Sequence, residues 1–427
     1  MLSREENELL TRTGPGKPMG DLLRRYWIPA MLPWELPHPD CPPVRIRLLG
    51  EDLIAIRDTN GRIALLDQYC PHRRVSLFFG RNEACGLRCA YHGWKFDVDG
   101  NCVDMPSEPP ESNFKDKVKI KAYPCEEWGG VIWTYMGPPE LRPPLPEQEW
   151  ALVPPSHRYI TKRIEQCNYF QAIEGGIDSS HVSILHSGKA LGGLGVAEDA
   201  QSHDLLARDT APRFEVDETD YGLLIAAKRD AGNNENYWRI TQFIMPWYTM
   251  IPPLKGMPRG GHAWVPIDDE NCYVWNWSWH PSRPFTEEEL LREQEGKGIH
   301  VELIPGSFLP KQNKANDYLI DREAQARGET FSGVIGVSMQ DAAVQESAGP
   351  IVDRSLERLG SSDKGIIMAR QMMLRAARQI QTGVEPPALQ PESHHVRAVS
   401  VVLPANVPYR EGARELLQLS QEDYVAP

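Results

Sequence analysis

Short runs in which apolar and polar residues alternate dominate the N-terminal part of the chain. PVRIRLLG, DLIAIRD and IALLDQY follow one another between positions 43 and 69, with turn signals at 50–52 and 59–61. Alternation with a period of two, bounded by Gly, Asn and Asp, is typical of half-buried β-strands. Similar runs continue to GGVIWTYMG at 129–137, so we predict an all-β domain over residues 26–140. A helical segment is predicted before it, over residues 1–25, where the turn GPGKP leads into MGDLLRRYW.

A proline-rich stretch, GPPELRPPLPEQEWALVPP, ends this pattern and predicts a linker over residues 141–160. Beyond it, strands are expected between 213 and 280. Helices are expected at 165–187, 286–296, 340–360 and 363–383. Antiparallel strands flanked by helices predict an α+β fold for a second domain over residues 161–427, and we expect the segment 1–25 to pack on it.

Composition and charge narrow the functional classes. The 427 residues carry a formal net charge of −13, and 41% of them are hydrophobic. This length predicts two or three domains, and the negative charge argues against nucleic acid or an anionic membrane as a partner. The N-terminal MLSREENELLTRTG lacks the apolar run of a signal peptide, and no stretch approaches the roughly 18 apolar residues of a membrane span. We therefore expect a cytoplasmic protein whose thiols are reduced.

Two of the eight cysteines carry a histidine at a matching offset, in Cys70-x-His72 and Cys89-x-x-His92. One interpretation is a tetrahedral Cys2His2 zinc site. The other is a Rieske [2Fe–2S] cluster, in which two thiolates hold one iron and two imidazoles hold the other, so that each loop offers one ligand of each kind. The mirrored spacing favours the cluster, because zinc fingers usually pair like ligands with like. The six other cysteines are expected to be structural.

The sequence around this motif, CPHR at 70–73 and GLRCAYHGWKFDVDGNCVDMPS at 86–107, closely resembles the Rieske domain of the ring-hydroxylating oxygenases. The likeness covers nearly the whole chain and is greatest to the phthalate dioxygenase group, as in ENELLTRTGPGKPMGDLLRRYW, QFIMPWYTMIPP and QDAAVQESAGPIVDRS. It implies a second domain of the helix-grip (START-like) kind with a mononuclear Fe(II), O2 as co-substrate, and homotrimers or stacked trimers. Electrons from NAD(P)H and flavin would arrive through a separate reductase, since the chain has no plant-type ferredoxin cysteine cluster and no GxGxxG fingerprint after a strand.

A mononuclear non-haem iron is typically held by two histidines and one carboxylate. In EGGIDSSHVSILHS at 174–187, Asp178 and His181 lie one helical turn apart. His186 would point about 140° away from His181 on a regular helix, so the helix must end or distort between them. On its own this pattern is a weak signal. The resemblance implies that His181 and His186 bind the iron, and that Asp178 bridges an iron ligand to a cluster histidine of a neighbouring subunit.

The third iron ligand is expected far along the chain, and the resemblance points to Asp341 in SMQDAAVQES. The alternative role for an aspartate that opens a helix is an N-cap. Glu346 and Asp353 are further candidates for this ligand. Asn168, on the same predicted helix as the histidine motif, is expected either near the iron or as a hydrogen-bonded structural residue.

Members of the phthalate dioxygenase group act on aromatic carboxylates, which implies hydroxylation of phthalate to its cis-4,5-dihydrodiol. A carboxylate in an apolar pocket requires a cation, and arginine suits it through bidentate pairing. Arg239 shares a strand face with Tyr237 and Thr241 in NYWRITQFIMPW and is the first candidate. Arg208 in LLARDTAPRF is the second. A structural ion pair or an exposed charge is the alternative for each.

Three other functions remain open from the sequence. An O-demethylase or ether-cleaving monooxygenase of the same family would use the same metal sites. A Rieske electron carrier would lack the mononuclear iron, and a zinc-stapled binding protein would lack both centres. The set of Asp178, His181 and His186 argues against the electron carrier, and a colourless preparation would favour the zinc-stapled protein.

Overall fold

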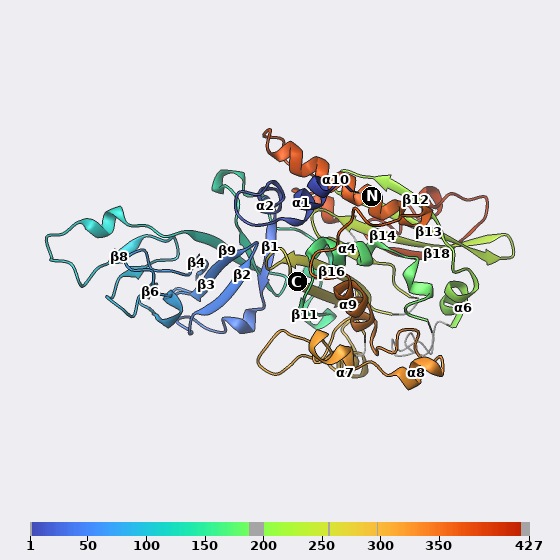
Figure 1. The fold of residues 1–427 in the computed structure, drawn as a ribbon, viewed down its shortest axis with the longest axis horizontal. Coiled ribbons are helices and arrows are strands. Elements are labelled where there is room, and N and C mark those ends of the chain that lie inside the picture. The colour runs from blue at the N-terminus through green and yellow to red at the C-terminus, as the bar shows by residue number, and fades with distance from the viewer. Residues whose placement is uncertain (1, 188–199, 255–256, 297, 420–427) are drawn as a thin grey trace.

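The computed structural model describes residues 2–187, 200–254, 257–296 and 298–419, which fold into two units that lie side by side along the long axis of the molecule (Figure 1). The smaller unit, blue to teal in Figure 1, contains the strands predicted from the alternating pattern. The larger unit contains the other strands and most of the helices. An all-β unit joined to an antiparallel sheet with helices confirms the predicted α+β class. Within the described ranges, no helix combines the length and the apolar character that crossing a membrane requires.

Two antiparallel sheets form the smaller unit. One has six strands in the order β1-β10-β9-β4-β3-β2, and the other has four in the order β5-β6-β7-β8. Ile54, Leu66, Leu87 and Phe96 lie in a core shared by these sheets, and their burial anchors the loops that follow β4 and β6. The strand bounds are Trp27–Met31 (β1), Val44–Leu48 (β2), Glu51–Arg57 (β3), Ile63–Asp67 (β4), Arg81–Glu83 (β5), Gly86–Arg88 (β6), Lys95–Phe96 (β7), Cys102–Asp104 (β8), Ala122–Trp128 (β9) and Val131–Tyr135 (β10).

An eight-stranded antiparallel sheet supports the larger unit, in the order β11-β17-β16-β15-β14-β13-β12. β18 pairs with the first half of β14, and β15 pairs with its second half. The strand bounds are Arg158–Glu165 (β11), Arg213–Glu218 (β12), Gly222–Gly232 (β13), Glu235–Ile244 (β14), Tyr248–Ile251 (β15), Arg259–Pro266 (β16), Cys272–Trp279 (β17) and Val399–Pro404 (β18).

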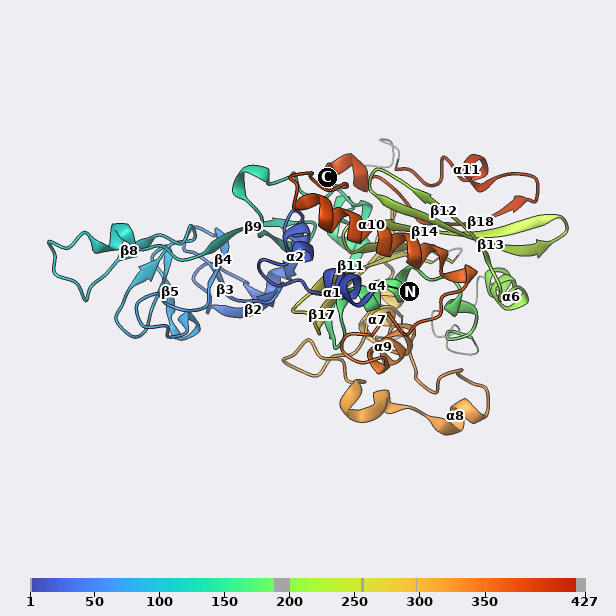
Figure 2. The same cartoon turned by 45° about the horizontal axis from the view of Figure 1, so that its top comes forward.

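The longest helix, α10, packs along this sheet and against the N-terminal helices (Figure 2). Its buried residues Ala369, Met373, Ala376 and Ile380 recur every three or four positions, which gives one apolar face. That face contacts β12 and β13, and α10 also contacts α1, α2 and α4. The helix bounds are Arg4–Thr11 (α1), Pro18–Leu23 (α2), Glu149–Leu152 (α3), Tyr169–Ile177 (α4), Ala200–Arg208 (α6), Glu287–Gln294 (α7), Arg322–Ala326 (α8), Val337–Ser347 (α9), Lys364–Ile380 (α10) and Tyr409–Gly412 (α11). The 3-10 helices are Pro33–Glu35 (η1), Leu77–Phe79 (η2), Phe114–Lys117 (η3), Pro139–Leu141 (η4), Pro155–His157 (η5), His181–Ser183 (η6), Lys314–Leu319 (η7), Ser361–Asp363 (η8) and Pro391–His394 (η9).

Helix α4 lies against β14, β15 and β16 and carries the Gly-Gly pair in its last turn. A Cβ on Gly176 would lie 2.1 Å from Cη2 of Trp264, and a Cβ on Gly175 would lie 2.2 Å from Nε2 of Gln345. The two glycines lie inside α4, in its last turn. They allow the end of α4 to approach the sheet and α9 closely.

Three of the predicted segments differ from the structure. The helix expected over 165–187 covers only Tyr169–Ile177. The helix expected over 340–360 ends at Ser347, because Gly349 with a φ of +93° and Pro350 follow it. The proline-rich stretch expected to be a linker carries α3, whose Trp150 is buried.

Tryptophans join the two units. Trp150 stacks on Trp277 of β17 with ring centroids 4.6 Å apart, and on Trp133 of β10 at 6.1 Å. Trp275 extends the row from Trp277 at 6.2 Å. All four indoles are buried, so the six-stranded sheet, the eight-stranded sheet and α3 between them share one apolar core.

Candidate metal centres and their cavity

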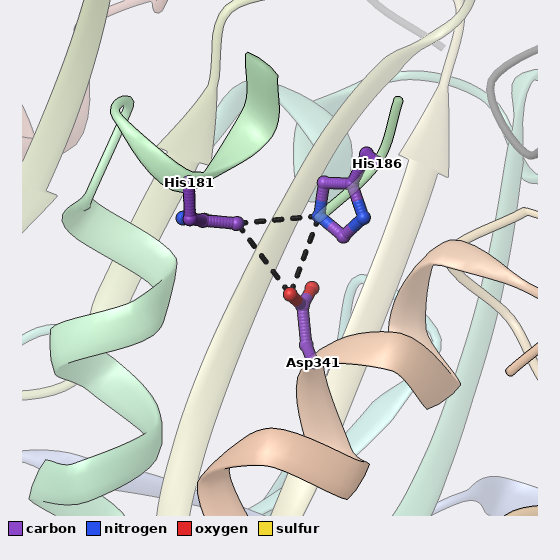
Figure 3. Close-up of side chains that lie close together, drawn as sticks. All are labelled: His181, His186 and Asp341. Carbon is purple, nitrogen blue, oxygen red and sulfur yellow. Dashed lines mark hydrogen bonds and ion pairs between the residues drawn. The ribbon is translucent and has the colours of Figure 1, made fainter. Parts of the chain in front are cut away.

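Two histidines and one aspartate converge beside the end of α4 (Figure 3). Nε2 of His181 lies 3.2 Å from Nε2 of His186. Oδ1 of Asp341 lies 3.4 Å from the first of these nitrogens and 3.2 Å from the second. Metal–ligand bonds of about 2.1 Å place neighbouring ligands about 3.0 Å apart in an octahedron and about 3.4 Å apart in a tetrahedron. The three atoms thus have the spacing of ligands on one face of a metal ion, as in a two-histidine, one-carboxylate iron site.

Asp178 shapes the loop that presents the two histidines. It ends α4 as the C-cap in an extended conformation, and its carboxylate accepts hydrogen bonds from the backbone N–H groups of Ser180 at 2.6 Å and His181 at 3.3 Å. Aspartate favours such turns because its side chain can bond backbone groups two or three residues on. The short helix η6 follows, so the distortion predicted between His181 and His186 is confirmed. Oδ2 of Asp178 also accepts a hydrogen bond from Nδ1 of His181 at 3.3 Å.

Gln340 on α9 fixes the orientation of His186. Its Nε2 donates to the carbonyl of Val334 at 3.0 Å, so its Oε1 is the atom that faces the ring. Nδ1 of His186 therefore carries the proton and donates to Oε1 at 2.7 Å. Nε2 of His186, which faces Asp341, is left with the lone pair that a metal ion needs.

The charges of this triad favour a cation at its centre. Burial alone would lower the pKa of His181, but the carboxylates of Asp178 and Asp341 outweigh burial and raise this pKa to about 10. Burial would likewise raise the pKa of Asp341, whereas the two histidines hold it well below its usual range. A proton therefore takes the place of the metal ion in the metal-free triad. A divalent metal would displace that proton, because histidine coordinates only in its neutral form.

The Cys/His motif occupies two loops of the smaller unit, after β4 and after β6. Cys70 and Cys89 are buried, whereas His72 is exposed and His92 is half-buried. The two imidazoles lie side by side with ring centroids 4.5 Å apart, and His72 also stacks on Trp94 at 4.5 Å. Burial raises the pKa of the Cys70 thiol to about 11. A bound iron would have to supply the positive charge that stabilises thiolates there.

Geometry distinguishes between the two interpretations of this motif. The two thiols lie close enough to interact, and the two imidazole rings contact each other. Two inner sulfurs and two outer imidazoles match a cluster in which each pair holds a different iron.

A cavity of about 210 Å³ opens beside the His181, His186 and Asp341 triad. Its apolar wall is formed mainly by Val182, Leu206, Ile251, Leu254, Trp264 and Ile299. Arg239 on β14 also lines it and is only 5% exposed. Its Nε and Nη1 atoms have no hydrogen-bond partner in the part of the chain that the structure describes. A buried cation with free donors is costly unless a ligand satisfies it, so the cavity is suited to an anion.

Other candidate residues lie away from this cavity. Asn168 is the buried N-cap of α4, and its Nδ2 donates to the carbonyls of Asp269 at 2.7 Å and Thr11 at 3.0 Å. The structure thus gives it the hydrogen-bonded structural position, and it is not among the residues that line the cavity. Arg208 is exposed at the end of α6 and does not line the cavity either.

The two fallback candidates for the third iron ligand also lie outside the triad. Glu346 accepts hydrogen bonds from the Gln166 N–H at 3.1 Å and the Tyr318 hydroxyl at 2.6 Å. Asp353 is bound to Ser355 at 2.6 Å.

Four residues that line the cavity or hold the two iron-site histidines were not predicted from the sequence. Gln340 orients His186, and Arg229 on β13 holds the loop that contains η6. Arg163 lines the cavity with Nη2 2.9 Å from Oε2 of Glu165, and His262 lines it with Nδ1 2.7 Å from Oδ1 of Asn276. Strand alternation, the signal that identified Arg239, would have found Arg229, which shares a strand face with Leu223, Ile225 and Ala227. It would not have found Arg163, because the strand RYITKRIE that carries it is charged throughout.

Two family models match the chain. The model described as Rieske [2Fe-2S] domain matches residues 26–124. The model described as LigXa C-terminal domain like matches residues 134–422.

Characterised relatives match nearly the full length. The oxygenase subunit of phthalate 4,5-dioxygenase from Pseudomonas putida is 43% identical over 90% of this chain and 88% of its own. The oxygenase subunit of 3-chlorobenzoate-3,4-dioxygenase from Comamonas testosteroni is 38% identical over 91% and 92%. That of 5,5'-dehydrodivanillate O-demethylase from Sphingobium sp. is 34% identical over 91% and 84%.

Solved structures share the fold at low sequence identity. The terminal oxygenase of carbazole 1,9a-dioxygenase from Nocardioides aromaticivorans superposes with a TM-score of 0.58 at 18% identity, covering 87% of this chain and 96% of that one. The oxygenase in a reduced complex with ferredoxin, also of carbazole 1,9a-dioxygenase, gives a TM-score of 0.55 at 19% identity, covering 88% and 94%.

Proposed function

The chain belongs to the Rieske non-haem iron oxygenases, as the oxygenase subunit of an aromatic ring-hydroxylating dioxygenase, and we propose that it converts phthalate to the cis-4,5-dihydrodiol. The observation that carries this proposal is Arg239, a buried guanidinium with free donors in the cavity beside the metal triad. The relatives named for phthalate and 3-chlorobenzoate support a carboxylate on the substrate.

In this proposal Cys70 and Cys89 hold one iron of the cluster, and His72 and His92 hold the other. His181, His186 and Asp341 hold the mononuclear iron, with spacings that fit one ion. When bound, the cluster supplies electrons one at a time and the mononuclear iron activates O2.

The protein then contributes binding, orientation and exclusion of water. Arg239 pairs with a substrate carboxylate through two parallel N–H···O bonds, which fixes the direction of the aromatic ring. The apolar wall removes water and strengthens this ion pair. Gln340 keeps the proton of His186 on Nδ1, and Asp178 does the same for His181, so that both Nε2 atoms face the iron.

We propose that electrons reach the iron across a boundary between subunits. His72 is exposed, and the side chain of Asp178 is 21% exposed beside His181. A second copy of the chain could therefore bring its cluster histidines to Asp178, which supports a homotrimer or stacked trimers. The solved ferredoxin complex of a carbazole 1,9a-dioxygenase oxygenase supports a ferredoxin or flavin reductase as the separate electron donor.

The test is aerobic turnover with phthalate, a surrogate reductase and isotopically labelled O2. We expect a product that has gained two hydrogens and two oxygens, both oxygens labelled. A methoxylated or ether-linked aromatic acid, assayed in parallel for formaldehyde or phenol, tests the O-demethylase alternative, which the 34% identical relative favours. Turnover of the ether substrate with no dihydrodiol from phthalate would replace the proposal by that alternative.

A further inference from the structure

Arg229 is a second buried arginine beside the cavity, and it is bound to the loop that carries the two histidines. Its side chain is fully buried, and its Nη2 donates to the carbonyl of Ser179 at 2.6 Å. Longer contacts of 3.4 Å reach the hydroxyls of Ser179 and Ser183. Its Nε donates to the carbonyl of Asp209, just beyond α6, at 3.1 Å. Arg229 therefore ties the segment between Asp178 and His186 to the sheet.

Arg229 and Arg239 are neighbours on one face of the sheet. Arg229 is paired with Tyr237 across β13 and β14, so Arg239 is its diagonal neighbour two residues on. Such diagonal positions lie about 7–8 Å apart. Burial, together with the positive charge of Arg239, lowers the pKa of Arg229 to about 10.

Neither guanidinium forms an ion pair within the described ranges, although the carboxylates of Asp209 and Asp178 attract Arg229 from a greater distance. The acceptors of Arg229 are neutral carbonyls and hydroxyls, and Arg239 forms no ion pair there. Two like charges in a low-dielectric site repel each other, and an anion bound to one of them removes that repulsion.

We infer that Arg229 is a positioning residue that couples occupation of the Arg239 site by a substrate carboxylate to the conformation of the loop that presents His181 and His186. This inference rests on the proposed function, because it requires a carboxylate at Arg239. With the site empty, repulsion from Arg239 weakens the bonds of Arg229 to Ser179 and Ser183. With the site filled, those bonds strengthen and hold the loop. Coupling between two binding events is reciprocal, so substrate tightens metal binding and metal tightens substrate binding.

The primary test measures how fast the protein loses its mononuclear iron(II) to a coloured chelator, with and without saturating phthalate. In the wild-type protein we expect phthalate to slow this loss by about fivefold or more, the lower end of typical coupling between sites. In Arg229→Lys the positive charge remains. A lysine cannot donate at once to the carbonyls of Ser179 and Asp209 as the guanidinium does, so these hydrogen bonds are lost. We expect calorimetry to show phthalate still binding this variant, while the effect of phthalate on iron loss disappears. A merely structural brace would accelerate iron loss equally with and without phthalate, and that result would overturn the inference.

Two controls separate this inference from the proposed function. Arg208→Lys alters an exposed arginine on α6 and should keep the full effect of phthalate. Arg239→Gln should weaken phthalate binding itself, by about tenfold to a hundredfold. If phthalate does not bind the wild-type protein, the proposed function fails and the inference fails with it. If it binds through Arg239 and still protects the iron in Arg229→Lys, the inference alone fails.

A second measurement needs no variant, in case Arg229→Lys does not fold. Hydrogen–deuterium exchange of the metal-free wild-type protein is followed in peptides that cover residues 178–187. We expect phthalate to slow exchange there, and phthalamide, its neutral analogue, to leave it unchanged. Bound phthalate without any slowing at 178–187 would contradict the coupling.

Discussion

Replacing Arg239 by methionine is the sharpest test of how this cavity selects its ligand. Methionine is apolar and flexible, so it fills much of the same space without a charge or a donor. The guanidinium it removes is 5% exposed, and both Nε and Nη1 lack hydrogen-bond partners in the described part of the chain. The substitution therefore deletes the carboxylate contact without breaking a visible bond of the ligand-free protein.

The magnitude follows from the chemistry of that contact. A hydrogen bond to a charged group contributes about 1.5–3 kcal/mol net, and each 1.4 kcal/mol is about tenfold in affinity. Loss of the Arg239 clamp should therefore raise the Kd and the apparent KM for phthalate by about tenfold to a hundredfold. The same substitution should stabilise the ligand-free protein by about 1–3 kcal/mol, because a buried cation with free donors is removed.

The assays are calorimetric titration with phthalate, steady-state kinetics, and thermal unfolding of the ligand-free protein. The iron content of Arg239→Met and the colour from its cluster should equal those of the wild-type protein. Arg208→Met is the matched control, because Arg208 is exposed and outside the cavity wall, and it should leave the KM unchanged. Unchanged kinetics in Arg239→Met would eliminate this residue as the carboxylate clamp, and a raised KM in Arg208→Met would show that the substrate binds elsewhere.

Three further predictions follow from the same geometry. Asp178→Asn should leave both metal centres bound but greatly slow product formation in a single turnover, because its charge holds His181; a rate equal to wild type would refute the bridging role. Gln340→Leu should weaken mononuclear iron binding about 10–100-fold while the cluster absorbance is unchanged, as expected when an orienting partner of a histidine ligand is lost. Burial, partly offset by Arg163, raises the pKa of Glu165 from 4.5 to about 7. Between these two pH values the folded protein keeps a proton on Glu165 that the unfolded chain has released. The free energy of unfolding of the metal-free protein should therefore fall by on the order of 3 kcal/mol between about pH 4.5 and 7, and chemical denaturation should show a smaller fall in Glu165→Gln.

Several expectations rest on short stretches of sequence and need no contact between distant segments. Cys70, His72, Cys89 and His92 stand in two short loops, so their spacing alone favoured a cluster over zinc. The need for the helix to end or distort between His181 and His186 followed from the 3.6-residue period. Arg239 was found because a charge inside an apolar strand stands out against strict alternation.

The features that the sequence did not reveal depend on contacts between distant segments. The place of Asp341 came only from the family resemblance, because nothing local joins it to His181, 160 positions earlier. Gln340 looks like an ordinary helix residue until Val334 fixes its amide. Asn168 was within reach of the sequence, since an asparagine just before a helix is a common N-cap. The helix expected over 340–360 is shorter in the structure because Gly349 and Pro350 end it.

The row of indoles between the two sheets determines how this protein can be dissected. The matched family regions end at 124 and begin again at 134, which invites expression of each half on its own. Fragments with those bounds would lack Trp133, uncover the face of Trp150 on which it stacks, and cut through β9 and β10 of the six-stranded sheet. Such fragments would tend to aggregate, so spectroscopy of the isolated cluster half should begin from the intact polypeptide with only its mononuclear iron removed.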